Sequence, residues 1–146
     1  MREASERGRQ AMLSVAGLER PRLAELCAQA ASYEGGGAVC HVASELSPKV
    51  FTVGGSEAAI LRLGSLAVEA GALQAKVLRA SGAFHTSLMK PAQSKLGQAL
   101  DEMLPRMKPP RCTVYMNATT AAVKVGTPPA QVVELLKKQL TSTVLW

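Results

Sequence analysis

Aromatic side chains are scarce in this sequence, and their scarcity argues against one class of function before any motif is considered. Only 3% of the 146 residues are aromatic: one Trp, two Tyr and two Phe. Proteins that bind single-stranded nucleic acid stack the bases on exposed aromatic rings. The net charge of +6 therefore favours an acidic protein or an anionic small molecule as partner, and we expect no nucleic acid.

Cysteines and long apolar runs are also few. The three cysteines, Cys27, Cys40 and Cys112, include no CxxC pair. This usage predicts buried thiols in a reducing, intracellular compartment, and neither a disulfide framework nor a metal site. No run approaches the roughly 18 apolar residues of a membrane span, and the Arg-rich start lacks a signal-peptide core. We expect no membrane partner, and the choice between cytoplasm, mitochondrion and plastid stays open.

What the sequence does contain is a globular composition, 47% hydrophobic and 19% charged, with strand and helix signals in a recognisable order. The first part predicts strand, helix, strand, strand, helix, strand, which is the split βαβ or ferredoxin-like order. The predicted elements are strand 11–16, a helix from 21 to 34, strands 39–46 and 50–53, helix 57–70 and strand 74–80. The fold class is therefore α/β (α+β), with a ferredoxin-like subdomain over residues 10–81.

Residues 82–146 have a different pattern. The sequence predicts a loop over 81–90, a helix over 91–104, a strand over 112–116 and a last helix from 127. One strand and two helices cannot close a sheet of their own, so this part is predicted to belong to a larger α/β lobe. The apolar end, Val144-Leu145-Trp146, is expected to form an exposed edge.

Two residues are candidates for chemistry on local pattern. His85 lies between a strand and a helix, where α/β folds place catalytic groups, although most loop histidines only bond to their neighbours. Ser56 follows Gly54-Gly55, close to a G-x-S-x-G nucleophile elbow. A serine directly before a helix is more often its N-cap, and we predict that role for Ser56. His41, in mid-strand, is predicted to be structural.

Together the motifs resemble the malonyl-CoA:acyl carrier protein transacylase family, the acyltransferases of fatty acid and polyketide synthesis. The resemblance runs in the family's order along nearly the whole chain and implies a ferredoxin-like small lobe inserted into an α/β-hydrolase-like lobe. The matching segments are Gly82-Ala83-Phe84-His85-Thr86-Ser87-Leu88-Met89-Lys90-Pro91-Ala92, Val114-Tyr115-Met116-Asn117-Ala118-Thr119, Gln139-Leu140-Thr141-Ser142 leading to Trp146, and Gln10-Ala11-Met12-Leu13-Ser14-Val15.

The resemblance also implies an activity: transfer of malonyl from malonyl-CoA to the phosphopantetheine thiol of an acidic acyl carrier protein, by a Ser/His ping-pong mechanism. It makes His85 the general base and acid, Gln139 an active-site glutamine, and Asn117 a residue that orients the histidine loop. Phe84, directly before the histidine, is the residue that accompanies malonyl specificity in the family. No cofactor is implied, since the coenzyme A thioester is a substrate, and a monomer is expected at full length.

Several family features are missing from the printed sequence. It has no G-H-S-x-G elbow, no G-Q-G-x-Q segment and no equivalent of the carboxylate-binding arginine, and Val50 stands where the family has a glutamine. We therefore expect a C-terminal-half fragment that is inactive alone. Two alternatives stay open: an independent serine hydrolase using Ser56 and His85, and a small ferredoxin-like binding module of RNA-recognition type, for which the middle strands offer only Phe51.

Overall fold

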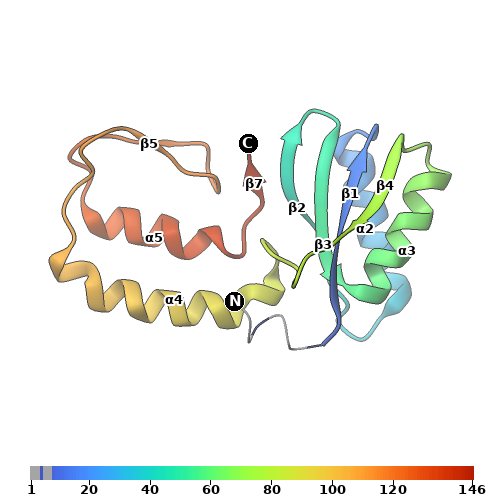
Figure 1. The fold of residues 1–146 in the computed structure, drawn as a ribbon, viewed down its shortest axis with the longest axis horizontal. Coiled ribbons are helices and arrows are strands. Elements are labelled where there is room, and N and C mark those ends of the chain that lie inside the picture. The colour runs from blue at the N-terminus through green and yellow to red at the C-terminus, as the bar shows by residue number, and fades with distance from the viewer. Residues whose placement is uncertain (1–3, 5–7) are drawn as a thin grey trace.

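The computed structural model describes residue 4 and residues 8–146. Figure 1 shows two parts side by side: a twisted sheet with helices packed on one face, and further helices that lie next to each other below a small β-ribbon. The predicted mixed α/β class is confirmed. In the described residues no helix combines the length and the apolar character that a membrane crossing requires.

The first part is built as the strand and helix pattern predicts. Its four antiparallel strands lie in the order β4-β1-β3-β2, which is the ferredoxin-like arrangement. Pro21 lies in the first turn of the first helix, where its missing N–H costs no hydrogen bond, and Gly35 ends that helix with φ +63°. The elements are β1 (Gln10–Ala16), α2 (Arg20–Glu34), β2 (Cys40–Ser47), β3 (Val50–Ser56), α3 (Glu57–Glu69) and β4 (Gln74–Leu78).

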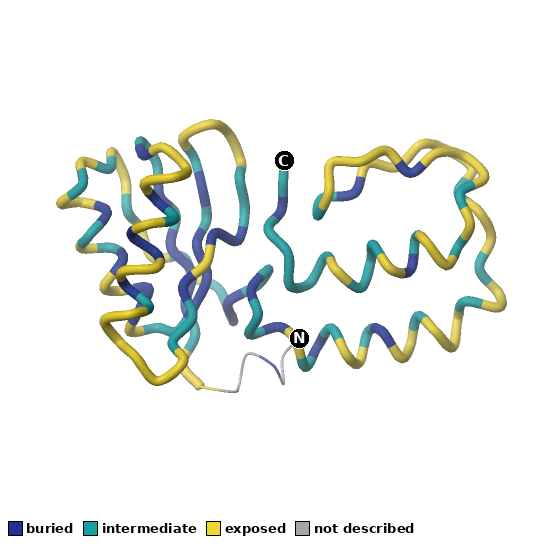
Figure 2. The backbone as a smooth tube through the Cα atoms, turned by 180° about the vertical axis from the view of Figure 1, so that it is seen from behind, coloured by how far each residue is buried: buried dark blue, intermediate teal, exposed yellow. Residues whose placement is uncertain are grey.

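A single apolar core lies between this sheet and its two helices (Figure 2). Its largest members are fully buried: Leu13 and Val15 from β1, Leu23 from α2, Phe51 and Val53 from β3, and Ile60 and Leu63 from α3. The backbone directly before β2 approaches β3 so closely that a Cβ on Gly55 would lie 2.0 Å from the Val39 carbonyl oxygen, so only glycine fits there.

The second part contains less buried apolar surface. It comprises η1 (Ser87–Met89), α4 (Lys90–Met103), η2 (Leu104–Arg106), β5 (Val114–Tyr115), β6 (Ala122–Val123), α5 (Pro129–Gln139) and β7 (Val144–Leu145). Along the two long helices only Ala92, Gly97 and Val133 are buried. Helices α4 and α5 lie against each other in both views of the chain (Figures 1 and 2).

The apolar end of the chain differs from its prediction. Val144 is buried and β7 joins the first part's sheet, pairing in parallel with Ser44 and Glu45 of β2, although Trp146 beyond it is 87% exposed. A two-residue strand has no periodicity from which sequence could predict it. The division between residues 81 and 82 stays a prediction, and β7 shows that the two predicted parts share one sheet.

Two further expectations are corrected. The strand expected over 112–116 is only β5, and it pairs with β6, which the sequence did not indicate. Cys27 and Cys40 are buried as predicted, but Cys112 is exposed because it precedes this short ribbon at the surface.

Candidate functional site

The candidate site centres on the loop that carries His85, between β4 and η1. His85 has φ +59°, a left-handed conformation that costs a non-glycine residue about 1–3 kcal/mol unless its surroundings enforce it. The next residue supplies that constraint: Thr86 is buried, and its Oγ1 donates to the Ala83 carbonyl at 2.6 Å and accepts from the Leu88 N–H at 3.3 Å. Thr86 thus closes the turn on both sides of the histidine.

The sheet also shapes this loop. A Cβ on Gly54 of β3 would lie 3.0 Å from Thr86 Cγ2 and 3.3 Å from the Phe84 carbonyl oxygen. The glycine therefore lets the histidine loop lie directly on the sheet. The Ala83 N–H donates to Gln10 Oε1 at 3.0 Å, so the loop is also bonded to β1.

The imidazole of His85 has one hydrogen-bond partner among the described residues. Its Nδ1 lies 3.0 Å from the backbone carbonyl oxygen of Gln139, at the end of α5. Because a carbonyl oxygen only accepts, Nδ1 must carry the hydrogen in this contact, and the neutral ring then presents an unprotonated Nε2. An oriented imidazole with a free lone pair on Nε2 is equipped to accept a proton.

The histidine faces a hollow of about 430 Å³ between α2, β2 and the segment after α5. Arg20, at one side of the hollow, is bonded through Nε to the Glu45 carboxylate. The other lining residues are small, apolar or hydroxyl-bearing, apart from the second histidine: Ala24, Cys27, Ala28, Ala31, Cys40, His41, Val42, Thr86, Ser87, Thr141 and Thr143. The hollow thus brings both histidines of the chain to one surface.

The structure brings two of the four predicted site residues into contact and places a third beside them. His85 and Gln139 meet through the Gln139 main chain, and Phe84 packs on the cluster around Met89. Asn117 lies elsewhere: its carbonyl accepts from the Leu145 N–H at 2.8 Å, and it lines a separate hollow beside Trp146. Its predicted part in orienting the histidine loop stays a prediction.

Ser56 stands directly before α3 but does not cap it. Its Oγ accepts from the Val39 N–H at 3.1 Å, and its own N–H donates to the Val39 carbonyl at 2.8 Å. Ser56 thus occupies the N-cap position of α3 as predicted, but the predicted capping hydrogen bond is not made, because Val39, directly before β2, donates to the hydroxyl instead. In the described part of the chain no hydrogen bond joins Ser56 to His85.

Cys27 and Cys40 form a buried thiol pair at one wall of the hollow. The hydrogen bond of the protonated Cys27 thiol to Cys40, together with burial, raises the pKa of Cys27 far above its ordinary range. The thiol therefore stays protonated at neutral pH and is a poor nucleophile. Among the described residues no group of three or more His, Cys, Asp and Glu side chains is arranged to hold a metal ion.

Sequence reasoning missed three residues around the site. His41 was predicted to be structural, yet it is exposed and lines the hollow. Thr86 lies inside the quoted histidine motif without an assigned role, and Gln93 was not singled out. The residue type of Gln93 gave no signal, but its position in the first turn of the predicted helix 91–104, directly after the histidine loop, was a possible indication.

Comparison with known proteins finds relatives that share one name. No protein-family model matches the chain. The malonyl CoA-acyl carrier protein transacylase of Haemophilus influenzae is 32% identical over 146 residues, which cover 100% of this chain and 44% of the relative. The human enzyme of that name, described as mitochondrial, is 32% identical over 150 residues, which cover 100% of this chain and 37% of the relative.

Solved structures agree. The acyl-carrier-protein S-malonyltransferase of Burkholderia pseudomallei superposes with a TM-score of 0.85 and 28% identity, covering 99% of this chain and 45% of that one. A type II PKS acyl-carrier protein in complex with its malonyl-transacylase matches with the same TM-score and identity, covering 99% and 44%. The chain spans less than half the length of these relatives. In sequence and in fold, the chain is similar from end to end to a part of the malonyl-CoA:acyl carrier protein transacylases.

Proposed function

We propose that this chain supplies the histidine side of a malonyl-transfer site. The substrate is malonyl-CoA, the acceptor is the phosphopantetheine thiol of an acyl carrier protein, and the nucleophile is a serine outside these 146 residues. The observation that carries the proposal is the 3.0 Å contact between His85 Nδ1 and the Gln139 carbonyl, which leaves Nε2 to accept a proton. The net charge of +6 suits an acidic carrier protein.

In the proposed reaction, Nε2 of His85 takes the hydroxyl proton of the serine as its oxygen attacks the thioester carbonyl of malonyl-CoA. The C–S bond breaks, and the coenzyme A sulfur leaves with the proton that Nε2 returns. The thiol of the carrier protein then attacks the malonyl-serine ester, giving its proton to Nε2, which passes it to the departing serine oxygen. The Gln139 carbonyl steadies the imidazolium in both steps, as a carboxylate does in a Ser-His-Asp triad.

The other site residues have roles that follow from the family resemblance. Phe84 leaves little room for an added methyl on the acyl group and so favours malonyl over methylmalonyl, a discrimination of about 1–3 kcal/mol. The side chain of Gln139 lies near the malonyl carboxylate, and Asn117 steadies the histidine loop from the β5–β6 side. No cofactor takes part.

The two alternative functions have less support. An independent hydrolase needs Ser56 as nucleophile, but its hydroxyl is bonded to the Val39 backbone. A binding module of RNA-recognition type needs an exposed aromatic ring on its middle strands, but Phe51 is 1% exposed and packs in the core. The acyl-transfer proposal depends on neither feature.

The experiment that tests the proposal has two arms. In the first, the folded chain and its Ser56→Ala variant are incubated with malonyl-CoA, and their intact masses are measured by mass spectrometry. We expect no adduct on either, and a malonyl adduct that disappears in Ser56→Ala would establish the hydrolase alternative instead.

The second arm supplies the missing serine. The part of the Haemophilus influenzae relative that precedes the match is joined to this chain, and transfer of malonyl to a carrier protein is measured. We expect activity that His85→Ala lowers by about 10²–10⁴-fold, while Ser56→Ala leaves it unchanged. A chimera as active with His85→Ala as without it would refute the role of His85.

A further inference from the structure

The two partners of the histidine contact are carried by different helices. His85 leads through η1 directly into α4, and Gln139 is the last residue of α5. Whether the Gln139 carbonyl lies within hydrogen-bond distance of His85 Nδ1 therefore depends on how α5 is placed along α4. A shift of one helix by a fraction of a turn, about 1.5 Å per residue, would break the contact.

Apolar packing fixes that placement only weakly. On the two helices the buried residues are Ala92 and Gly97 of α4 and Val133 of α5. Gly97 faces the aliphatic stem of Lys137, since a Cβ at position 97 would lie 3.6 Å from Lys137 Cε. Val133 is the largest fully buried side chain of these two helices, so we expect polar contacts to carry much of the helix register.

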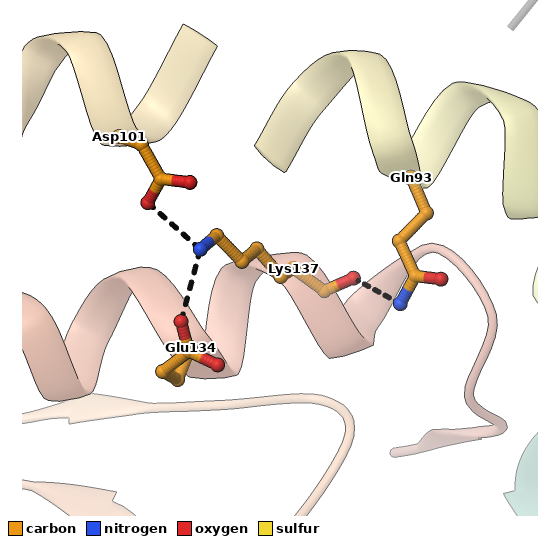
Figure 3. Close-up of polar contacts among 4 residues, drawn as sticks. All are labelled: Gln93, Asp101, Glu134 and Lys137. Atoms are coloured by element: carbon orange, nitrogen blue, oxygen red, sulfur yellow. Dashed lines mark hydrogen bonds and ion pairs between the residues drawn. The ribbon is translucent and has the colours of Figure 1, made fainter. Parts of the chain in front are cut away.

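A small polar cluster supplies those contacts (Figure 3). Gln93 Nε2, on α4, donates to the main-chain carbonyl of Lys137 at 2.9 Å. The ammonium of Lys137 donates to Asp101 Oδ1 on α4 at 2.8 Å and to Glu134 Oε1 on its own helix at 3.0 Å. Gln93 therefore holds a point on α5 only two residues before Gln139.

The atom that Gln93 holds has no intrahelical donor. The carbonyl of Lys137 belongs to the last turn of α5, where carbonyls lack an N–H four residues on within the helix. The N–H of Thr141 donates to Lys138 instead, at 3.2 Å. A side chain from α4 thus completes the end of α5, and the end of α5 carries the carbonyl that orients the histidine.

We propose that Gln93 is a positioning residue for His85. By holding the Lys137 carbonyl, it fixes the Gln139 carbonyl against His85 Nδ1, and so keeps Nε2 as the nitrogen that accepts protons. The catalytic meaning of this role rests on the proposed function, but the role itself can be measured without catalysis.

The test is the tautomer of His85, read from the ¹⁵N chemical shifts of its ring in the full 146-residue chain at a pH where the ring is neutral. The variant is Gln93→Leu, which keeps a side chain of similar bulk and removes the donor. Gln98→Leu is the matched control, because Gln98 is exposed on the same helix. The ring of His41 serves as an internal reference.

We expect the Nδ1–H form to predominate in the parent chain and in Gln98→Leu. In Gln93→Leu the ratio of the Nε2–H form to the Nδ1–H form should rise by roughly two- to tenfold, the change that loss of one hydrogen bond produces. An unchanged ratio in Gln93→Leu, or an equal rise in Gln98→Leu, would overturn the positioning role and leave the proposed function standing. A parent chain already in the Nε2–H form would overturn both.

Asp101→Asn is the second variant, for use if Gln93→Leu does not fold. It weakens the same helix pairing through Lys137 from an exposed position. We expect a smaller shift of the ratio in the same direction, and no shift would contradict the inference.

Discussion

The sheet part of the chain, residues 10–78, and the helical part, residues 87–146, are held together by different forces. Of the ten largest fully buried side chains among the described residues, seven belong to the sheet part and only Met89 and Val133 to the helical part. The helical part relies on hydrogen bonds and ion pairs between α4 and α5. The tenth of these side chains, Thr86, lies in the loop between the two parts.

This difference has a functional meaning. The sheet part is a stable platform, and the groups proposed to do chemistry lie where the less densely packed helical part meets it. Regions with few buried apolar contacts open at lower free energy than the core of a domain. The orientation of His85 is therefore expected to be more easily disturbed than the fold itself.

The largest expected effect is a loss of stability when a large side chain is removed from the core of the sheet part. Phe51→Ala removes the largest fully buried side chain in the described part of the chain and should lower the free energy of unfolding by about 3–5 kcal/mol. Urea unfolding followed by far-ultraviolet circular dichroism measures it. Val68→Ala, at a 62% exposed position of α3, is the control and should change stability by less than about 0.5 kcal/mol. Equal losses in the two variants would contradict the assigned core.

The next effect tests the border between the two parts. Gly54→Ala would place a Cβ against Thr86 and the Phe84 carbonyl, and we expect a loss of about 1–3 kcal/mol with displaced amide resonances in residues 83–88. Gly64→Ala makes the same substitution inside α3, where the nearest atom is Leu13 Cδ1 at 3.8 Å. It should raise stability by about 0.5–1 kcal/mol. Gly54→Ala resonances that match the parent chain would show that the loop does not rest on this glycine.

A smaller effect is expected in the helical part. Asp101 and Glu134 raise the pKa of Lys137 above its ordinary value, so the stabilisation they provide is complete below about pH 10.4, the pKa of an unfolded lysine, and is lost as the pH rises through the higher folded value. Lys137→Met should lower the urea midpoint slightly at neutral pH. The difference should shrink in high salt and vanish at strongly alkaline pH. A difference that salt leaves unaltered would point to lost packing.

The smallest expected effect is a difference in cysteine alkylation between the two parts of the chain. Native chain treated with iodoacetamide near neutral pH should gain one label, on Cys112, because that thiol is exposed while Cys27 and Cys40 are buried and the pKa of Cys27 is raised. Intact mass gives the count, and denatured chain should gain three labels. Rapid labelling of all three in the native chain would mean that the sheet core is open to solvent.

The sequence predicted the sheet part almost completely, because each of its elements is long enough to show a period. It failed on β6 and β7, since two-residue strands show no alternation, and β7 in addition pairs with β2, which lies far back in the chain. For the site, His85 and Gln139 could be singled out through their motifs. The hydrogen bond between them could not be predicted, because every residue has a main-chain carbonyl and only the fold determines which carbonyl the histidine contacts.

The use of the Gln139 main-chain carbonyl has a consequence for which mutations can disturb the site. A carboxylate that orients a histidine is lost through one codon change, whereas a main-chain oxygen survives every substitution at its own position. Apart from changes at His85 itself, substitutions can disturb the Gln139 contact only indirectly, through residues that move the end of α5 or reshape the histidine loop. Substitutions that break this contact indirectly are therefore expected at positions that pair the helices or shape the histidine loop, and not at position 139 itself.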